Sequence, residues 1–136
     1  MELDQAREFG RRHHRAVLTT HRPSGGIQQS PVLTTVDELG RFTISSREAA
    51  YKTLNVRADP WAQLLVLDDS FFGSWIWVEG TAEVVSLPDA MEPLVVYYRS
   101  ISGEHDDWDD YRARMAEEHR VLLRLSPDRA GPDHEG

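Results

Sequence analysis

The stretch WAQLLVLDDSFFGSWIWVEGTAEVVS, residues 61–86, decides the fold. Residues 61–67 are strongly apolar, residues 68–74 carry Asp, Ser and Gly, and residues 75–86 form a long run rich in Trp, Ile, Val and Thr. β-Branched and aromatic residues favour strands, and a short polar loop between two such runs is typical of a hairpin. The stretch therefore predicts two antiparallel strands.

The rest of the chain reads as further strands with short helices between and after them. Strands are predicted at residues 15–21, 27–36, 41–45 and 121–125, and helices at residues 3–13, 47–58, 88–103 and 107–120. Pro31 predicts an edge position or a bulge, and Pro93 predicts a kink or a division of its helix. Because long βα alternation is missing, we expect a mainly β protein, a small antiparallel barrel with peripheral helices. One domain should span residues 1–126, followed by a mobile tail at 127–136.

Composition excludes several classes of function. The 15 basic residues against 23 acidic ones give a formal net charge of −8, which disfavours nucleic acid and anionic membranes as partners. The chain has no cysteine, so disulfides, thiol catalysis and thiolate metal sites are excluded. The polar N-terminus does not resemble a signal peptide, and no apolar run is long enough to span a bilayer. We therefore expect a cytoplasmic protein.

Three cations, Arg47, Lys52 and Arg57, lie between two predicted strands of this acidic chain. The intervening helix is predicted to begin near Ser46 and Arg47, where free backbone N–H groups favour an anion. Ser46, Arg47 and Lys52 are therefore candidate anion ligands. The spacing also allows another interpretation, in which the cations are solvated surface charges paired with Glu48 or Asp59.

Helical spacing also predicts which side of this segment is buried. The expected core stripe consists of Ala50, Leu54 and Ala58. Lys52 and Asn55 would lie roughly opposite that stripe, whereas Arg57 should diverge from Lys52.

Period-two alternation divides the strand at residues 75–86 into two faces. The aliphatic face, which we expect to point into the barrel, consists of Ile76, Val78, Ala82 and Val84. Trp75 and Trp77 fall on the opposite face, beside carboxylates. Paired tryptophans in such a place suggest a subunit interface or a flat ligand, and burial beneath the C-terminal helices is the alternative.

The side chains of the chain do not form a self-sufficient catalyst. The sequence contains no nucleophile, phosphate-loop or zinc motif, and its histidines lack the spacing of metal ligands, so we expect no metal site. Gln28 and Ser30, beside Pro31, offer neutral hydrogen-bonding groups that suit a polar heterocycle, although such residues also occur on ordinary strands. Any redox chemistry should therefore come from a bound cofactor.

The order of several segments resembles one family. The most specific are KTLNVRADP (52–60), EGTAE (79–83) and SGEHDDWDDYR (102–112). Together with the strands around them, they resemble the PPOX-class deazaflavin-dependent oxidoreductases, relatives of pyridoxamine 5′-phosphate oxidase. The resemblance covers roughly residues 9–125.

This resemblance implies a split β-barrel homodimer that binds coenzyme F420, an 8-hydroxy-5-deazaflavin with a phosphate and an oligoglutamate tail, at the subunit interface. It implies that Lys52 and Asn55 meet the phosphate region. The strand carrying Gln28, Ser30 and Pro31 would line the ring or the ribityl chain. The aromatic group approaching from the other subunit would be Trp75 or Trp77.

The implied activity is hydride transfer from reduced F420 to a small unsaturated organic acceptor. An FMN-binding oxidase or reductase of the same fold, or a non-catalytic F420-binding protein, remains the alternative. Close relatives often carry an arginine where this chain has Ala50. Arg47, one turn earlier, is the candidate to replace that charge, and without replacement FMN becomes the better fit.

Overall fold

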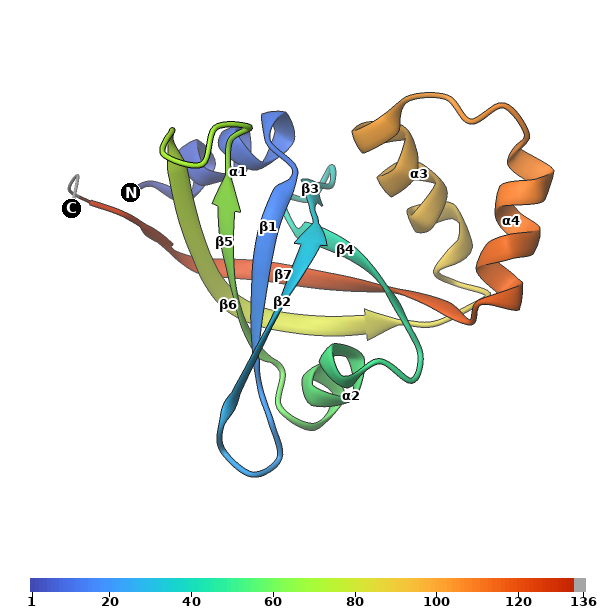
Figure 1. Cartoon of the computed structure of the whole chain (residues 1–136), viewed down its shortest axis with the longest axis horizontal. Coiled ribbons are helices and arrows are strands. Elements are labelled where there is room, and N and C mark those ends of the chain that lie inside the picture. Colours follow the sequence, from blue (N-terminus) through green and yellow to red (C-terminus); the bar gives the residue numbers. More distant parts are fainter. Residues whose placement is uncertain (134–136) are drawn as a thin grey trace.

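The computed structural model describes residues 1–133 (Figure 1). The strands are β1 (Arg15–His21), β2 (Ile27–Leu33), β3 (Thr35–Val36), β4 (Phe42–Arg47), β5 (Trp61–Leu67), β6 (Trp75–Val85) and β7 (Arg120–Gly131). The helices are α1 (Leu3–Arg12), α2 (Tyr51–Ala58), α3 (Met91–Ser102) and α4 (Trp108–Glu117). The strands form one antiparallel sheet of order β2-β1-β5-β6-β7-β4-β3, which curls into a half-barrel. This confirms the predicted mainly β split barrel with peripheral helices.

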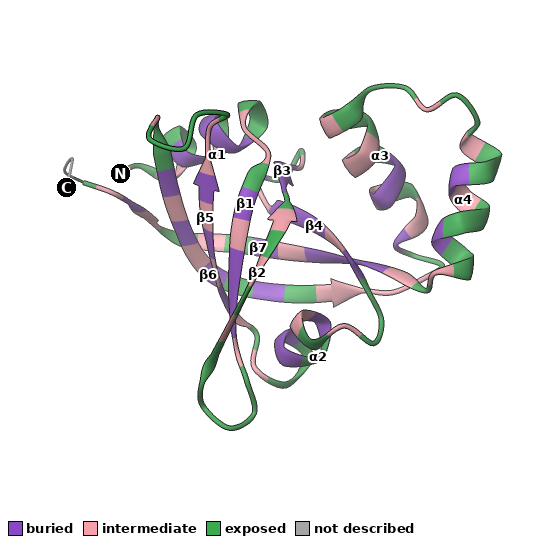
Figure 2. Ribbon diagram, in the orientation of Figure 1, coloured by how far each residue is buried: buried purple, intermediate pink, exposed green. Residues whose placement is uncertain are grey.

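Buried residues alternate with more exposed ones along strands of the curled sheet (Figure 2). On β5, for example, Ala62, Leu64 and Val66 are fully buried, while the residues between them are half-buried. Helix α1 contacts β3 and β7 at one end of the barrel, and α2 contacts β1 and β6 at the other. Helices α3 and α4 pack on the outer face, where Leu122 of β7 joins their separate apolar cluster. None of the helices within residues 1–133 is both long and apolar enough to cross a membrane.

Several predicted elements are confirmed. Strands β1 and β5 have the predicted bounds, and β6 ends one residue earlier than predicted. Pro31 lies on β2, which is an edge strand as predicted, because β2 pairs with β1 alone in the sheet. The predicted strand at 27–36 is interrupted at Thr34, and its last two residues form β3.

The predicted start of the helix at residue 47 is wrong. Arg47 ends β4, and α2 begins four residues later, at Tyr51. Residues 45–47 are drawn into the sheet because they pair with β7, with Ser46 opposite Val121 and Arg47 opposite Arg120. This long-range pairing overrides the local helical pattern. Ser46 and Arg47 therefore do not form a helix start.

Two further expectations are corrected. Pro93 neither kinks nor divides α3, because it lies in the first turn, where the missing N–H is tolerated. The tail was expected from residue 127, but β7 continues to Gly131, paired with Trp77 of β6. Of the predicted tail, residues 134–136 lie outside the described part of the chain.

Candidate functional site

Three cations gather where β4, β7 and α2 meet. Arg47 and Arg120 are register partners at the ends of their strands. They share the outer face of the sheet, because the neighbouring Ser46 and Val121 are buried on the inner face. Lys52, in the first turn of α2, is close enough for both guanidinium groups to affect it. Partial burial and then repulsion by Arg120 and Arg47 hold the pKa of Lys52 below its usual range.

One carboxylate offsets this positive charge. Glu118 Oε1 lies 3.1 Å from Arg120 Nη2 and 3.5 Å from Arg47 Nη2. The hydrogen bond from Arg120 is the main reason why the pKa of Glu118 is lowered. Arg120 Nε is buried and has no hydrogen-bond partner among the described residues. Glu118 therefore contacts two of the three cations, Lys52 has no ion pair among the described residues, and one buried donor is unused. We refer to Arg47, Lys52, Arg120 and Glu118 as the charged cluster.

Tyr97 of α3 lies between the charged cluster and the edge strand β2. Its hydroxyl donates a hydrogen bond of 2.9 Å to the carbonyl of Leu33. Burial raises the pKa of Tyr97, although the backbone of Ser45 and the charge of Arg120 oppose the rise. The phenol therefore stays protonated at neutral pH and acts as a hydrogen-bond donor.

The backbone of β2 presents polar groups to its open edge. The Thr34 N–H bonds to the His14 carbonyl, and the Arg22 N–H bonds to the Gly26 carbonyl. In the antiparallel register, these two bonds turn the N–H and C=O groups of alternate residues away from β1. The outward-facing set is Ile27, Gln29, Pro31 and Leu33. The proline thus stands where its missing N–H leaves the ladder intact, and Leu33 offers the carbonyl that Tyr97 uses.

Two predicted phosphate ligands are turned into the barrel. Ser46 Oγ lies 2.8 Å from Thr53 Oγ1, whose hydroxyl also bonds to the Arg47 carbonyl at 2.6 Å, so this pair ties β4 to α2. Asn55 is 3 % exposed and donates to Thr20 Oγ1 at 3.1 Å. Leu54, in contrast, is 48 % exposed. The predicted buried face of α2 is therefore wrong, because hydrogen bonds to β1 and β4 fix the helix rotation.

The remaining predicted residues lie on two separate surfaces. Gln28 and Ser30 of β2 are half-buried on the inner side of the edge strand, and Pro31 is exposed. Trp75 and Trp77 lie on the outer face of β6, at its first residues, whereas α2 approaches the other end through Ser86. The eleven residues of β6 span roughly 35 Å if extended. One chain therefore does not bring the tryptophans to the charged cluster.

Neither tryptophan is buried beneath the C-terminal helices. Trp75 is 38 % exposed, and the half-buried Trp77 packs against the backbone of Gly131 so closely that a Cβ atom there would clash with the indole. Trp77 thus contacts the end of β7 rather than α3 or α4. This leaves the interface and flat-ligand interpretations of the pair.

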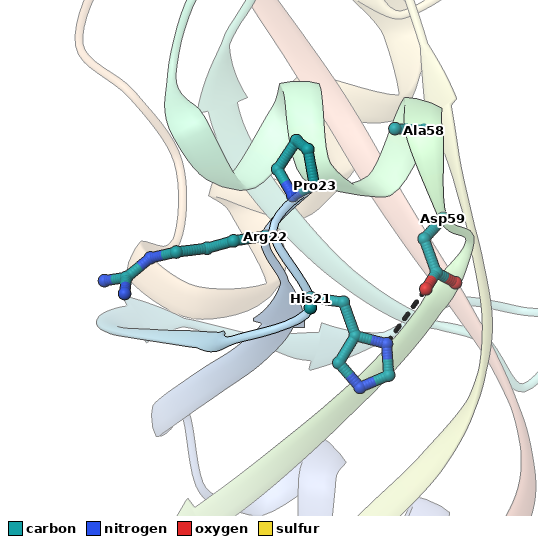
Figure 3. Close-up of a pocket in the computed structure, with 6 residues that line it drawn as sticks. His21, Arg22, Pro23, Ala58 and Asp59 are labelled. Atoms are coloured by element: carbon teal, nitrogen blue, oxygen red, sulfur yellow. Dashed lines mark hydrogen bonds and ion pairs between the residues drawn. The ribbon is translucent and has the colours of Figure 1, made fainter.

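A hollow lies at the other end of α2 (Figure 3). Its volume is about 580 Å³, and its lining is His21, Arg22, Pro23, Gly25, Ala58 and Asp59. His21 Nδ1 lies 2.9 Å from Asp59 Oδ2, and the imidazole stacks on Trp61 with 4.1 Å between ring centroids. Bonds from His21 and from the Trp61 N–H lower the pKa of Asp59. Arg57, nearby on α2, bonds to Glu48 and Ser86, which confirms the ion-pair alternative for this cation.

Comparison with known proteins identifies the family. Residues 3–131 match the family model described as pyridoxamine 5′-phosphate oxidase. The chain belongs to this family. Its half-barrel, with the edge strand β2 left open beside α3, is the split-barrel fold of this oxidoreductase family.

Solved structures share the fold across the whole family domain. The conserved hypothetical protein Rv2991 from Mycobacterium tuberculosis is 21% identical with a TM-score of 0.77, and the match covers 100% of this chain and 91% of that one. A protein described as an F420 reductase is 20% identical with a TM-score of 0.70, covering 91% and 94%. HutZ, a heme storage protein from Vibrio cholerae, is 13% identical with a TM-score of 0.70, covering 96% and 94%. At these identities the similarity shows the split-barrel fold, and the ligand must be argued from the residues of this chain.

Sequence reasoning missed three residues of the site: Tyr97, Glu118 and Arg120. A signal for Arg120 was present, because Arg120, Leu122 and Arg124 alternate with the apolar Val121 and Leu123. That alternation predicts Arg120 on the non-core face of the last strand. Its pairing with Arg47 depends on the β4–β7 register, which no local pattern reveals.

Proposed function

We propose that this member of the family is an F420-dependent oxidoreductase that passes a hydride from reduced F420 to a small unsaturated organic acceptor. The observation that carries the proposal is the charged cluster, in which Arg47, Lys52 and Arg120 affect one another and Glu118 contacts only the two arginines, in a chain of net charge −8. Such an excess of cations, two of them half-buried, is stabilised when an anion binds there. A cofactor phosphate is the anion that the family resemblance provides.

The residues of the cluster fit a phosphate group. The buried Nε–H of Arg120 has no acceptor among the described residues and could donate to a phosphate oxygen. A guanidinium can also donate two parallel hydrogen bonds to phosphate oxygens. Lys52 adds a point charge from the first turn of α2. Arg47, rather than an arginine at position 50, supplies the third charge. Ser46 and Asn55 act indirectly in this proposal, because they fix β4 and α2 to the barrel.

The heterocycle would lie along the open edge of β2, beside Gln28, Ser30 and Pro31. The outward-facing N–H and C=O of Gln29 and the N–H of Leu33, whose carbonyl bonds to Tyr97, are suitable partners for the polar edge of a flavin-like ring. When bound, the cofactor supplies the hydride chemistry. The protein holds the phosphate, orients the ring and excludes water from one side of it. The acceptor gains the hydride and one proton, and solvent is the proton source in this proposal.

We also propose a homodimer. Val17, Leu65 and Trp77 are successive cross-strand partners on the outer face of β1, β5 and β6, and they form an apolar stripe that the described part of the chain leaves half-exposed. A second copy packed on this face would cover the stripe. It would also bring Trp75 or Trp77 of one subunit toward the cofactor of the other, which one chain cannot do.

FMN is the second candidate cofactor, and one observation favours it. The cluster is compact and suits a single phosphate, whereas Arg57, a candidate contact for an oligoglutamate tail, is already paired with Glu48. FMN has one phosphate and no tail. A non-catalytic F420-binding protein would use the same cluster and differ only in lacking an acceptor.

A fluorescence titration with F420 beside FMN tests the cofactor. We expect F420 to bind more tightly than FMN, with an affinity that falls as salt is raised, because part of the site is exposed. Tighter binding of FMN would move the protein to the second candidate. Stopped-flow mixing of the reduced holoprotein with enones and quinones then tests the activity. If no acceptor reacts faster than with free reduced F420, the protein binds the cofactor without being an enzyme.

A further inference from the structure

Glu118 is placed against the cations of the cluster by the backbone around it. It is the first residue of the turn from α4 into β7, and the next residue, His119, has φ = 52°, a left-handed conformation that residues other than glycine seldom adopt. The His119 carbonyl accepts a 2.9 Å bond from the Glu48 N–H, which ties this turn to the end of β4. Arg120 follows at once. The turn therefore holds Glu118 beside Arg47 and Arg120.

Both arginines contact the same oxygen of Glu118. Arg47 Nη2 and Arg120 Nη2 lie 3.5 Å and 3.1 Å from Oε1. One anionic oxygen shared by two guanidinium groups is the arrangement that a phosphate oxygen would take at this place. The carboxylate therefore lies where a phosphate oxygen bound by both arginines would lie.

We propose that Glu118 is an internal anion that selects the charge of the phosphate bound at the cluster, favouring a singly charged phosphodiester over a doubly charged phosphomonoester. This inference rests on the proposed function in so far as the phosphate of F420, substituted on both sides, is a diester and that of FMN is a monoester. Repulsion between Glu118 and a bound phosphate scales with the charge of that phosphate. A dianion thus loses about twice as much binding free energy to Glu118 as a monoanion does.

The low pKa of Glu118 supports this role, because the arginines keep the carboxylate charged throughout the neutral range. The other ionisable groups that face the cluster are Lys52 from α2, Tyr97 from α3 and Tyr111 from α4. Burial raises the pKa of both phenols, so neither adds negative charge at neutral pH. Glu118 therefore carries the negative charge that would repel a phosphate bound at the cluster.

The test compares Glu118→Gln with Glu117→Gln. Glu117 is exposed on the same turn of α4 and has no ion pair in the described structure, so both variants change the net charge equally. Affinities for FMN, F420 and riboflavin are measured by fluorescence at pH 8, where the phosphate of FMN is a dianion because its second pKa is about 6. We expect Glu118→Gln to strengthen FMN binding by about tenfold and F420 binding by about threefold. Glu117→Gln should change both by less than about twofold, and riboflavin should be unaffected.

Equal gains for FMN and F420, or no gain beyond that of Glu117→Gln, would overturn the proposal. So would weaker binding of both ligands, because it would mean that Glu118 orients the arginines instead of competing with the phosphate. Thermal denaturation checks that the variant is folded, and Glu118→Ser replaces it if it is not.

If the wild-type protein binds neither F420 nor FMN, the proposed function fails while the role of Glu118 remains testable. Inorganic phosphate, mostly a dianion at pH 8, and dimethyl phosphate, a monoanion, then serve as probes in ³¹P NMR titrations. Glu118→Gln should strengthen binding of the first more than that of the second. Equal effects on the two probes would refute the selection by charge.

Discussion

The two ends of α2 both carry cations, and they differ in how those cations are satisfied. At the first turn, Lys52 lies near Arg47 and Arg120, one carboxylate contacts only the two arginines, and a buried donor of Arg120 is unused. In the last turn, Arg57 forms an ion pair with Glu48 and donates a hydrogen bond to Ser86. A cation with a full set of partners stabilises the fold, whereas a group of cations with too few indicates a binding site.

The presence of a hollow does not by itself identify the binding site. The hollow beside His21 and Asp59 is large, about 580 Å³, but its imidazole and carboxylate bond to each other and the ring stacks on Trp61 (Figure 3). The charged cluster leaves a donor unpaired. We therefore judge a site by its unbalanced charge and its unused donors.

The largest expected effect is that of Arg120→Met. This change removes the buried donor and one of three positive charges, so binding of F420 or FMN should weaken about 10- to 100-fold. The melting temperature of the ligand-free protein should stay the same or rise, because an incompletely paired guanidinium is costly to bury. Titration and thermal denaturation of the same variant check both statements. A lower melting temperature with unchanged affinity would make Arg120 a structural residue.

The matched pair Lys52→Ala and Arg57→Ala tests the comparison between the two ends of α2. Lys52→Ala should weaken cofactor binding by at least about 1 kcal/mol, or fivefold, with little change in stability. Arg57→Ala should leave binding unchanged and lower the free energy of unfolding by less than about 1 kcal/mol, as for other surface ion pairs. Equal loss of binding in both variants would show that the anion site extends along the whole helix.

A smaller effect is expected for Trp75→Ala on the outer face of β6. If a second copy covers this face, the change should weaken cofactor binding by a few-fold and shift the dimer toward monomer, because aromatic contacts of this kind contribute about 1 kcal/mol. Leu39→Ala, at an exposed position in the turn before β4, is the control. Light scattering after size exclusion measures the assembly. A protein that is monomeric at every concentration would remove the tryptophans from the site.

The smallest effect on binding is expected for Asp59→Asn, at the C-terminal end of α2. The pKa of Asp59 is lowered by bonds from His21 and from the Trp61 N–H, so its stabilising contribution is present above about pH 4 and is lost as the pH falls through the lower folded-state value. Asp59→Asn should reduce the dependence of stability on pH in this acidic window and leave cofactor affinity unchanged. Acid denaturation curves of the two proteins provide the check. Weaker binding in this variant would mean that the hollow belongs to the site.

Local patterns predicted the strands well and the rotation of α2 badly. The apolar runs at 15–21 and 61–67 have strong β-forming composition, so their bounds were predictable. In α2 the apolar Leu54 is exposed and the polar Asn55 is buried, because Asn55 bonds to Thr20 of β1. A helix of eight residues carries too little pattern to show this.

The site was only partly predictable, because local sequence patterns reveal only those of its residues that lie close together in the chain. Lys52 and Arg47 lie close in sequence and were found by their charge in an acidic chain. Arg120 and Glu118 join them only through the pairing of β4 with β7, a contact between residues more than 70 positions apart. Such a contact is a property of the fold, and one sequence does not contain a local signal for it.

The most direct test of the central claim is whether binding requires the phosphate. FMN is titrated beside riboflavin, and F420 beside its phosphate-free 8-hydroxy-5-deazariboflavin core, at low and at high salt. If the charged cluster holds the phosphate, the phosphorylated form of the preferred cofactor should bind at least about tenfold more tightly than its core, and salt should reduce this difference. Equal affinities for a cofactor and its phosphate-free core, independent of salt, would contradict the account.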